Sequence, residues 1–386
     1  MNQRVGSEVV IIGGGVVGCA TAYYLGKEGV KATIIERDTV AGHASGFALG
    51  GLSPLGGAGI PDPLGVLSLE SYRLHNELAG ALLEETGVNT EFQHHTAITA
   101  AFSEDEVVAI QERLQWQQAQ EGFRVEWKDG KDILAIEPRL APNVVGGVVT
   151  QHVAMLDPYR FALALLQAAE SMGAVMRHGR VMDLCFEGDR VRAVCLSNQE
   201  IPCDAVVVAM GPWSASAAAW LGVDLPVTPL KGQILRLRIG GPPLSYVSWG
   251  HSYAVTKPDD LVWVGTTEEN AGFDETPSFE GRQTIMESAL EAFPYLVDAE
   301  VVLHTACLRP VAPDGLPILG QAPGKRGVTI ATGAGRKGIL FSPVMGRITA
   351  DLVVRGKTEY DIADLKPGRT IPEAQEAASQ SDPFRY

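Results

Sequence analysis

Residues 8–36 read EVVIIGGGVVGCATAYYLGKEGVKATIIE, and this stretch decides the fold of the chain. Glu8–Ile12 is rich in β-branched residues and predicts a buried strand. Residues 16–29 predict a helix that packs through small side chains, and residues 30–36 predict a second buried strand ending in an acid. The turn Gly13-x-Gly15-x-x-Gly18 joins the first strand to the helix. This order predicts a βαβ unit.

Each glycine of this turn has a physical reason to be there. Gly13 permits the tight turn, Gly15 lets a pyrophosphate approach the backbone, and Gly18 lets the helix pack on the strand. The N-terminus of the helix offers free N–H groups and a positive dipole end to the phosphates. Glu36 ends the second strand, where a carboxylate accepts from ribose hydroxyls and repels the 2′-phosphate of NADP. The turn predicts a dinucleotide site without distinguishing FAD from NAD.

The overall charge of the chain argues against one class of partner. Lys and Arg number 31 against 46 Asp and Glu, which gives a net charge of −15 in 386 residues. Such a chain repels phosphate backbones, and the sequence has no basic run with interleaved aromatic residues. We therefore expect no nucleic acid partner.

Cysteine usage and the apolar segments bear on compartment. The five cysteines form no CxxC pair and no Cys/His metal spacing, so we expect no metal site and a reducing compartment. The apolar run near the N-terminus is too short for a signal peptide, and no stretch reaches a membrane-spanning length. These features predict a cytoplasmic protein without a membrane span.

Nucleotide-type signals recur at the start, middle and end of the chain, with strand-rich segments between them. The sequence thus predicts an α/β fold with a discontinuous Rossmann-like domain formed by residues 1–86, 151–225 and 305–365. Residues 87–150 and 226–304 predict an inserted, mainly antiparallel β-sheet domain. Residues 366–386 predict a polar C-terminal tail.

Several motifs, in order along the chain, resemble a known family. They are Ser45-Gly46-Phe47-Ala48, Pro229-Leu230-Lys231-Gly232, Leu308-Arg309-Pro310 with the following Pro313-Asp314-Gly315, and Gly335-Arg336-x-Gly338. Together with the N-terminal turn they resemble the D-amino acid oxidase superfamily of FAD-dependent amine oxidoreductases. Within this superfamily the motifs look like those of glycine oxidase and bacterial D-amino acid dehydrogenase, and the resemblance covers nearly the whole chain.

The resemblance implies that the cofactor of the Rossmann-like domain is FAD. In the family, a hydride passes from the substrate Cα to the flavin, and the resulting imine hydrolyses. The cofactor-binding set that we expect is Gly13, Gly15, Val16, Val17, Gly18, Glu36, Arg37, Ser45, Gly50, Gly51, Leu52, Val181, Gly211, Trp213, Gly335, Arg336, Lys337, Gly338 and Ile339.

The resemblance also implies residues that contact the substrate. Arg309 occupies the position of an arginine that grips the substrate carboxylate with a bidentate fork. Tyr253 matches a second carboxylate contact, although a tyrosine in an alternating strand also fits ordinary packing. His251 is a weaker candidate of the same strand, where a neutral histidine is usually just hydrogen-bonded.

Two charged candidates keep two interpretations each. Glu268 stands where glycine oxidase carries an apolar residue, so it either attracts a cationic group of the substrate or belongs to a charged turn. Arg336 either stabilises the reduced flavin or covers the substrate pocket, and the competing interpretation is an exposed residue at a helix start.

Covalent attachment of FAD is left open by the sequence. Cys307 matches the place where the more distant monomeric sarcosine oxidase tethers FAD, but the nearer relatives bind it without a bond. A histidyl link through His43 is a poorer match to other relatives. Otherwise Cys307 is a small core residue, as Cys19 is on its helix.

The sequence therefore predicts an FAD-dependent oxidoreductase that acts on the CH–NH bond of a small amino acid or secondary amine. Electrons pass either to oxygen or, as in a dehydrogenase, to a quinone or carrier. A non-catalytic flavin-binding subunit is an alternative hypothesis, but such a subunit would not need Arg309 in its motif. An NAD-dependent dehydrogenase is a further alternative, which is disfavoured because this sequence has no second nucleotide motif. Substrate side chain, stereochemistry and assembly into a homo-oligomer are not decided.

Overall fold

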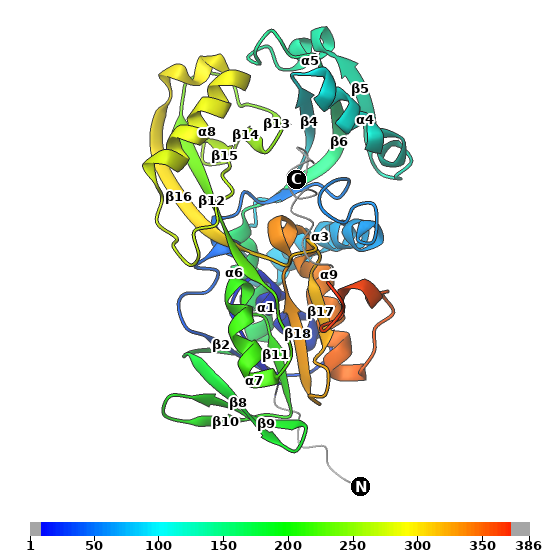
Figure 1. Ribbon diagram of the computed structural model, residues 1–386, viewed down its shortest axis with the longest axis vertical. Helices are drawn as coiled ribbons and strands as arrows, with labels where there is room; N and C mark the ends of the chain where they lie inside the picture. Colours follow the sequence, from blue (N-terminus) through cyan, green and yellow to red (C-terminus); the bar gives the residue numbers. More distant parts are fainter. Residues whose placement is uncertain (1–8, 372–386) are drawn as a thin grey trace.

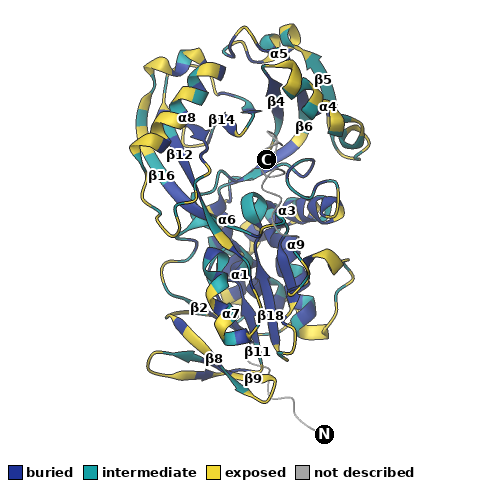
Figure 2. Ribbon diagram, viewed as in Figure 1, coloured by how far each residue is buried: buried dark blue, intermediate teal, exposed yellow. Residues whose placement is uncertain are grey.

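The computed structural model describes residues 9–371, so Glu8 and residues 372–386 of the expected tail lie outside the described residues. Figure 1 shows two large sheets, one above the other. Helices α1 (Val16–Lys27), α3 (Gly65–Thr86), α6 (Pro158–Ser171) and α9 (Gly338–Arg355) lie around the lower sheet. The core is deepest in that part, where strands β11 (Ala205–Val208) and β18 (Val328–Thr332) are coloured as buried in Figure 2.

A six-stranded sheet forms the lower part. Its strand order is β17 (Ile318–Gln321), β18 (Val328–Thr332), β11 (Ala205–Val208), β1 (Val9–Ile12), β2 (Ala32–Glu36) and β7 (Val175–His178). All neighbouring pairs are parallel except β17 with β18. Every residue of β1 is buried, as expected for a central parallel strand covered on both faces.

Of four helices in this part, α1 and α9 pack on the sheet, and α3 and α6 pack on those two helices and on each other. Small residues let α1 and α9 approach closely, because a Cβ on Gly346 would lie 2.7 Å from the carbonyl carbon of Ala20. The predicted βαβ unit is thus present, with α1 ending two residues before Gly29.

A nine-stranded sheet forms the upper part. Its order is β16 (Glu300–Val311), β12 (Thr228–Arg238), β15 (Val262–Gly265), β14 (Ser252–Thr256), β13 (Tyr246–Trp249), β4 (Gln93–Ala101), β6 (Gly146–Met155) and β3 (Gly51–Leu52), with β5 (Arg124–Asp129) on β6. Only β13 and β4 pair in parallel. Helices α4 (Glu104–Gln118), α5 (Gly130–Ile136) and α8 (Phe279–Ala292) lie against this sheet.

Long strands join the two parts. β16 begins in the upper sheet and reaches the turn after β18, where Val311 forms an antiparallel bridge with Ala334. β6 likewise continues across the domain limit predicted at residue 150, and β16 across the limit predicted at residue 304. The domain limits themselves remain predictions.

A small sheet of β8 (Val181–Glu187), β9 (Arg190–Leu196) and β10 (Glu200–Pro202) extends the lower part. The hairpin predicted over residues 181–195 is present, and it joins Cys185 to Cys195 in a disulfide. The expectation of a reducing compartment, where disulfides are rare, did not anticipate this pair. The spacing rules used on the sequence do not register two cysteines that only the folding of a hairpin brings together.

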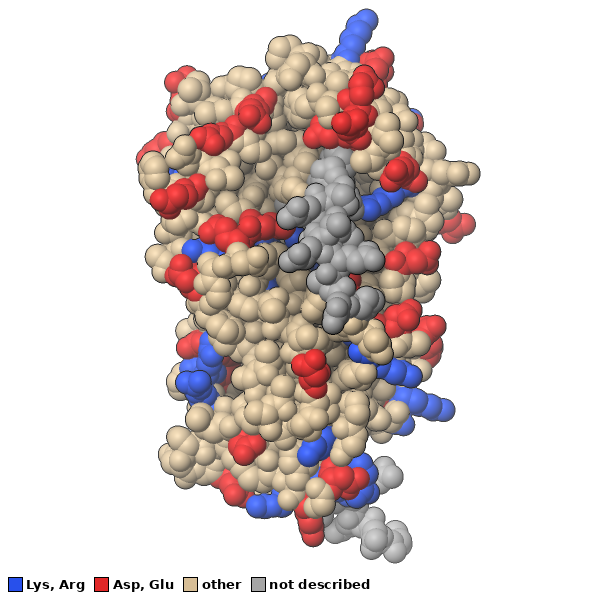
Figure 3. Space-filling view, in the orientation of Figure 1, with Lys and Arg blue, Asp and Glu red and all other residues tan. Residues whose placement is uncertain are grey.

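The remaining elements are short. They are α2 (Ala44–Phe47), α7 (Ala218–Leu221), and the 3₁₀ turns η1 (Gly211–Ala217), η2 (Pro294–Asp298), η3 (Gly335–Lys337) and η4 (Ala363–Leu365). Acidic side chains are spread over both halves of the face seen in Figure 3. Among residues 9–371, no helix combines the length and the apolar character that a membrane crossing needs.

Candidate active site

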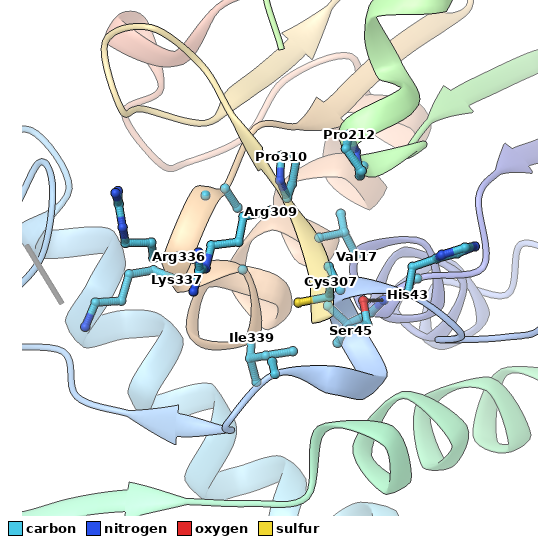
Figure 4. Close-up of a pocket in the computed structure, with 18 of the residues that line it drawn as sticks. Val17, His43, Ser45, Pro212, Cys307, Arg309, Pro310, Arg336, Lys337 and Ile339 are labelled. Atoms are coloured by element: carbon cyan, nitrogen blue, oxygen red, sulfur yellow. Dashed lines mark hydrogen bonds between the residues drawn. The ribbon is translucent and has the colours of Figure 1, made fainter. Parts of the chain in front are cut away.

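A cavity of about 720 Å³ lies where the two large sheets meet. It is lined by the glycine-rich turn after β1, the end of β2, the η1 and η3 turns, and one face of β12, β14 and β16. In Figure 4, Arg309 and Cys307 lie on one strand, while Val17 and Ser45 come from other segments of the wall. The site therefore gathers segments from the start, middle and end of the chain.

The glycine-rich turn has the close contacts that its sequence predicts. Gly13 has φ 110°, and a Cβ there would lie 2.3 Å from the carbonyl oxygen of Ala209. A Cβ on Gly18 would lie 2.0 Å from the carbonyl oxygen of Gly13, so a side chain has no room at either position. The Oγ atom of Ser45 accepts from the N–H of Val16 at 3.0 Å, at the start of α1.

Part of the cavity lining contains a fixed carboxylate and an aromatic ring that stacks with an arginine. Glu36 accepts from the N–H groups of Gly14 at 2.7 Å and Asp38 at 2.8 Å, which fixes its carboxylate at the end of β2. The guanidinium of Arg37 lies 4.0 Å from the ring centre of Trp213. A fixed acceptor beside a flat, cation-stacked ring suits the ribose and base of a dinucleotide.

Most of the expected cofactor residues line this cavity. They are Gly13, Gly15, Val16, Val17, Glu36, Arg37, Ser45, Gly50, Gly51, Val181, Gly211, Trp213, Gly335, Arg336, Lys337, Gly338 and Ile339. Gly18 and Leu52 lie behind the lining, where Gly18 packs against the turn and Leu52 is fully buried. The glycine turn, the N-terminus of α1 and the placed carboxylate fit a bound FAD.

Lys337 is a half-buried cation of the lining. Its Nζ atom donates to the carbonyl oxygen of Ser53 at 3.1 Å. Burial lowers the pKa of Lys337 to about 8 because the charged amine has lost much of its hydration. Near neutral pH the amine is therefore still mostly protonated, but it loses its proton more easily than a surface lysine.

Arg309 projects into the cavity from β16. Its Nη1 atom donates to the carbonyl oxygen of Thr267 at 3.1 Å and its Nη2 atom to Thr266 Oγ1 at 2.7 Å. On the neighbouring strand β12, a Cβ on Gly232 would lie 2.2–2.3 Å from the guanidinium atoms. The guanidinium of Arg309 thus packs flat against Gly232, which forms a floor beneath it. The hydrogen bonds to the turn after β15 fix the plane of the guanidinium.

Tyr253 has a similar floor on the next strands. It is 6% exposed and lines the cavity, and its register partner across β14 and β15 is Gly265. A Cβ on Gly265 would lie 2.4 Å from the Tyr253 hydroxyl oxygen, so the ring lies across this glycine. The structure therefore brings Tyr253 and Arg309 to the same cavity.

Glu268 and Arg336 form a bidentate ion pair. The Nε and Nη2 atoms of Arg336 donate to the two carboxylate oxygens of Glu268. Burial raises the pKa of Glu268, but the hydrogen bonds and charge of Arg336, with smaller contributions from Arg309 and His251, outweigh it and hold that pKa below its usual value. Arg336 lines the cavity, whereas Glu268 is an exposed residue outside the cavity lining.

The other candidates are placed as follows. His251 is exposed in the turn between β13 and β14 and lies outside the cavity lining. Cys307 is buried and lines the cavity two residues from Arg309, on the same face of β16, and burial raises the pKa of its thiol. His43 also lines the cavity, and its ring nitrogens lie 2.9 Å from carboxylate oxygens of Asp38 and Glu275.

Sequence reasoning missed the wall of the cavity that β4, β6, β13 and α4 provide. Polar residues of this wall are Thr99, Arg113, Gln117, Thr150, Tyr246 and Ser248. The alternation of residues along β4 and β6 indicates which side chains share a face. It does not indicate that this face turns toward a cavity, because that depends on how the two sheets meet.

Three comparisons with known proteins agree with this geometry. The family described as FAD dependent oxidoreductase matches residues 8–352. Glycine oxidase from Geobacillus kaustophilus is 31% identical over 368 residues, covering 94% of this chain and 97% of the relative. D-amino acid dehydrogenase from Rhizobium rhizogenes is 30% identical over 416 residues, covering 94% and 99%.

The fold of the chain is also that of a solved structure. The crystal structure of glycine oxidase from Geobacillus kaustophilus matches with a TM-score of 0.90 at 31% identity, covering 95% of this chain and 100% of that chain. These matches confirm the resemblance and the fold class that the sequence predicts.

Proposed function

We propose, from the premise that the chain belongs to the family of FAD-dependent oxidoreductases, that it oxidises the CH–NH bond of a small amino acid to an imine. Oxygen is the proposed electron acceptor, and water hydrolyses the imine after its release. Glycine, N-methyl glycine and small D-amino acids are the proposed substrate group, since relatives of similar identity are named glycine oxidase and D-amino acid dehydrogenase.

The placement of Arg309 carries this proposal. A guanidinium that lies flat on Gly232, with two of its nitrogens held by the turn at Thr266 and Thr267, presents a fixed cation to the cavity. A planar fork of this kind binds a carboxylate through two parallel hydrogen bonds. A cavity that only stored a flavin would have no use for such a group.

The protein would hold the cofactor through parts already described. The N–H groups at the start of α1 would face the pyrophosphate, and Glu36 would accept from the ribose hydroxyls. When bound, FAD supplies the two-electron oxidising capacity that the amino acid side chains lack.

The side chains of the chain would bind and orient the substrate. Arg309 would hold the carboxylate, and the hydroxyl of the buried Tyr253 would give a second contact to it. Two contacts to one end of a small molecule restrict its rotation and fix where its Cα–H bond points. Exclusion of bulk water by the buried lining would favour the neutral amine over the ammonium form.

Oxygen consumption and peroxide formation would test this proposal. Purified FAD-loaded protein would be supplied in air with glycine, N-methyl glycine, D-alanine and D-proline, and we expect at least one to give equal amounts of peroxide and consumed oxygen. Turnover only with an artificial electron acceptor would instead favour a dehydrogenase, the activity named for the Rhizobium rhizogenes relative. No turnover with either acceptor would contradict the proposed reaction.

A further inference from the structure

One turn contacts both arginines at this side of the cavity. The carbonyl oxygen of Thr267 and the Oγ1 atom of Thr266 accept from Arg309, and the next residue, Glu268, accepts twice from Arg336. Arg336 belongs to η3, which is 68 residues away in the chain. The turn therefore fixes two guanidinium groups that both line the cavity.

The hydrogen bonds leave the two arginines in different states of charge compensation. Those of Arg309 go to a neutral carbonyl and a neutral hydroxyl, so its positive charge is not cancelled by them. Those of Arg336 go to both oxygens of a carboxylate, which cancels one unit of charge. The three side chains together carry one net positive charge, the amount that one substrate carboxylate balances.

The surroundings of the Glu268–Arg336 pair make this compensation matter. The side chain of Arg336 is 18% exposed and that of Glu268 is 26% exposed. Glu268 as a whole residue is exposed and Arg336 is partly buried, so water screens the pair only in part, and its charges still act on a charged ligand nearby. Without Glu268, Arg336 would offer a second fork for an anion beside Arg309.

We propose that Glu268 sets the charge preference of the site: by occupying Arg336, it restricts binding to amines with one carboxylate and disfavours amino dicarboxylates. A second carboxylate would meet a guanidinium that is already paired and a repelling carboxylate behind it. This preference rests on the proposed function, because it concerns the substrate of the same cavity. It makes Glu268 a specificity-determining residue that need not touch the substrate.

The test uses ligands that cannot be oxidised. FAD-loaded protein would be titrated with acetate, which has one carboxylate, and with malonate, which has two, while the visible spectrum of the flavin is followed. In the unaltered protein we expect malonate to bind no more tightly than acetate. Tighter binding of malonate would overturn the proposal without any variant being needed.

Substitutions then assign the preference to the ion pair. In Glu268→Gln we expect the affinity for malonate relative to acetate to rise roughly tenfold or more, since a partly buried guanidinium has been released from its carboxylate partner. The double variant Glu268→Gln, Arg336→Gln should return to the original ratio. Asp189→Asn, which removes a carboxylate paired with Arg326 on the exposed β8–β9 turn, is the matched control and should leave the ratio unchanged.

An unchanged ratio in Glu268→Gln would show that the pair only joins two segments, and the proposal would then be wrong. Should this variant fail to retain FAD, Glu268→Met, which removes the same charge with an unbranched side chain, is measured in its place. The titration does not require turnover. A protein that oxidises no amine but shows the expected ratios would contradict the proposed function while supporting the charge preference.

Discussion

At the scale of single residues, the proposed role of Arg309 depends on the planar shape of its guanidinium as well as on its charge. Arg309 has its guanidinium plane fixed by Thr266, Thr267 and the floor at Gly232. A lysine would keep the charge but has no planar fork and no second parallel donor. Charge and geometry can therefore be separated experimentally at this position.

We predict that Arg309→Lys lowers kcat/KM for the best amino acid substrate by roughly 10- to 100-fold, mainly through KM. The loss corresponds to one charge-assisted hydrogen bond to the carboxylate, while the flavin spectrum should be retained. Steady-state kinetics checks the prediction. Arg326→Lys, at a surface ion pair with Asp189, is the control. Equal kinetics in Arg309→Lys and the parent protein would refute the carboxylate role.

Motif position was enough to single out Arg309, which the structure places in the cavity lining, whereas the partner of Glu268 was not predictable. Arg309 lies in a contiguous motif, and a contiguous motif is visible in one sequence. Glu268 meets Arg336 only because the turn after β15 and the η3 turn are brought together across the cavity. The two interpretations of each residue in the sequence did not include their pairing with each other.

At the scale of elements, two strands each have a glycine against which a side chain of a neighbouring strand packs. Gly232 in β12 supports Arg309 of β16, and Gly265 in β15 supports Tyr253 of β14. Glycine in a strand interior weakens the strand unless a close approach requires it. At these two positions the absence of a Cβ leaves room for a side chain that lines the cavity.

We predict that Gly232→Ala displaces the Arg309 guanidinium and lowers kcat/KM by at least about tenfold, because a Cβ would lie 2.2 Å from Nη2. FAD binding should persist, since Gly232 lies against Arg309 and is not part of the glycine-rich turn. Gly240→Ala, in the loop after β12, has no atom within 4 Å of its Cβ and is the matched control. Kinetics that do not differ between the two variants would contradict this role of the glycine.

The elements that sequence predicts best are those with a complete local signal. Residues 9–36 form the βαβ unit because strand, turn and helix signals are contiguous there. The order of the nine-stranded sheet was not predictable, since β16 pairs with β12 and β3 pairs with β6 across long stretches of chain. Such pairing depends on tertiary packing, which one sequence does not display.

At the scale of the whole molecule, a buried histidine joins two layers of helices. His75 in α3 is 1% exposed, and its Nε2 atom lies 3.0 Å from the carbonyl oxygen of Ile339 and 3.2 Å from that of Leu340, at the start of α9. Burial lowers the pKa of His75 to about 4. Between pH 6.5 and 4 the unfolded chain binds a proton at this position that the folded chain does not.

It follows that His75 makes the folded state less stable as pH falls from 6.5 to 4, by about 1.4 kcal/mol per pH unit at most. We predict that His75→Gln, whose amide still donates to a carbonyl, loses less stability over this range than the parent protein. Urea midpoints of the FAD-loaded proteins at pH 7.5, 6, 5 and 4.5 provide the measurement. Parallel profiles for variant and parent would show that His75 is not responsible for acid sensitivity.

The most direct test of the whole molecule as an amine-oxidising flavoenzyme is its visible spectrum without oxygen. We predict the bands of oxidised flavin in the purified or FAD-reconstituted protein, and their loss on addition of glycine, N-methyl glycine or a small D-amino acid. Such bleaching would show that cofactor and substrate meet in one cavity and exchange electrons there. Bands that no amine in the panel bleaches, or a colourless protein that does not take up FAD, would contradict it.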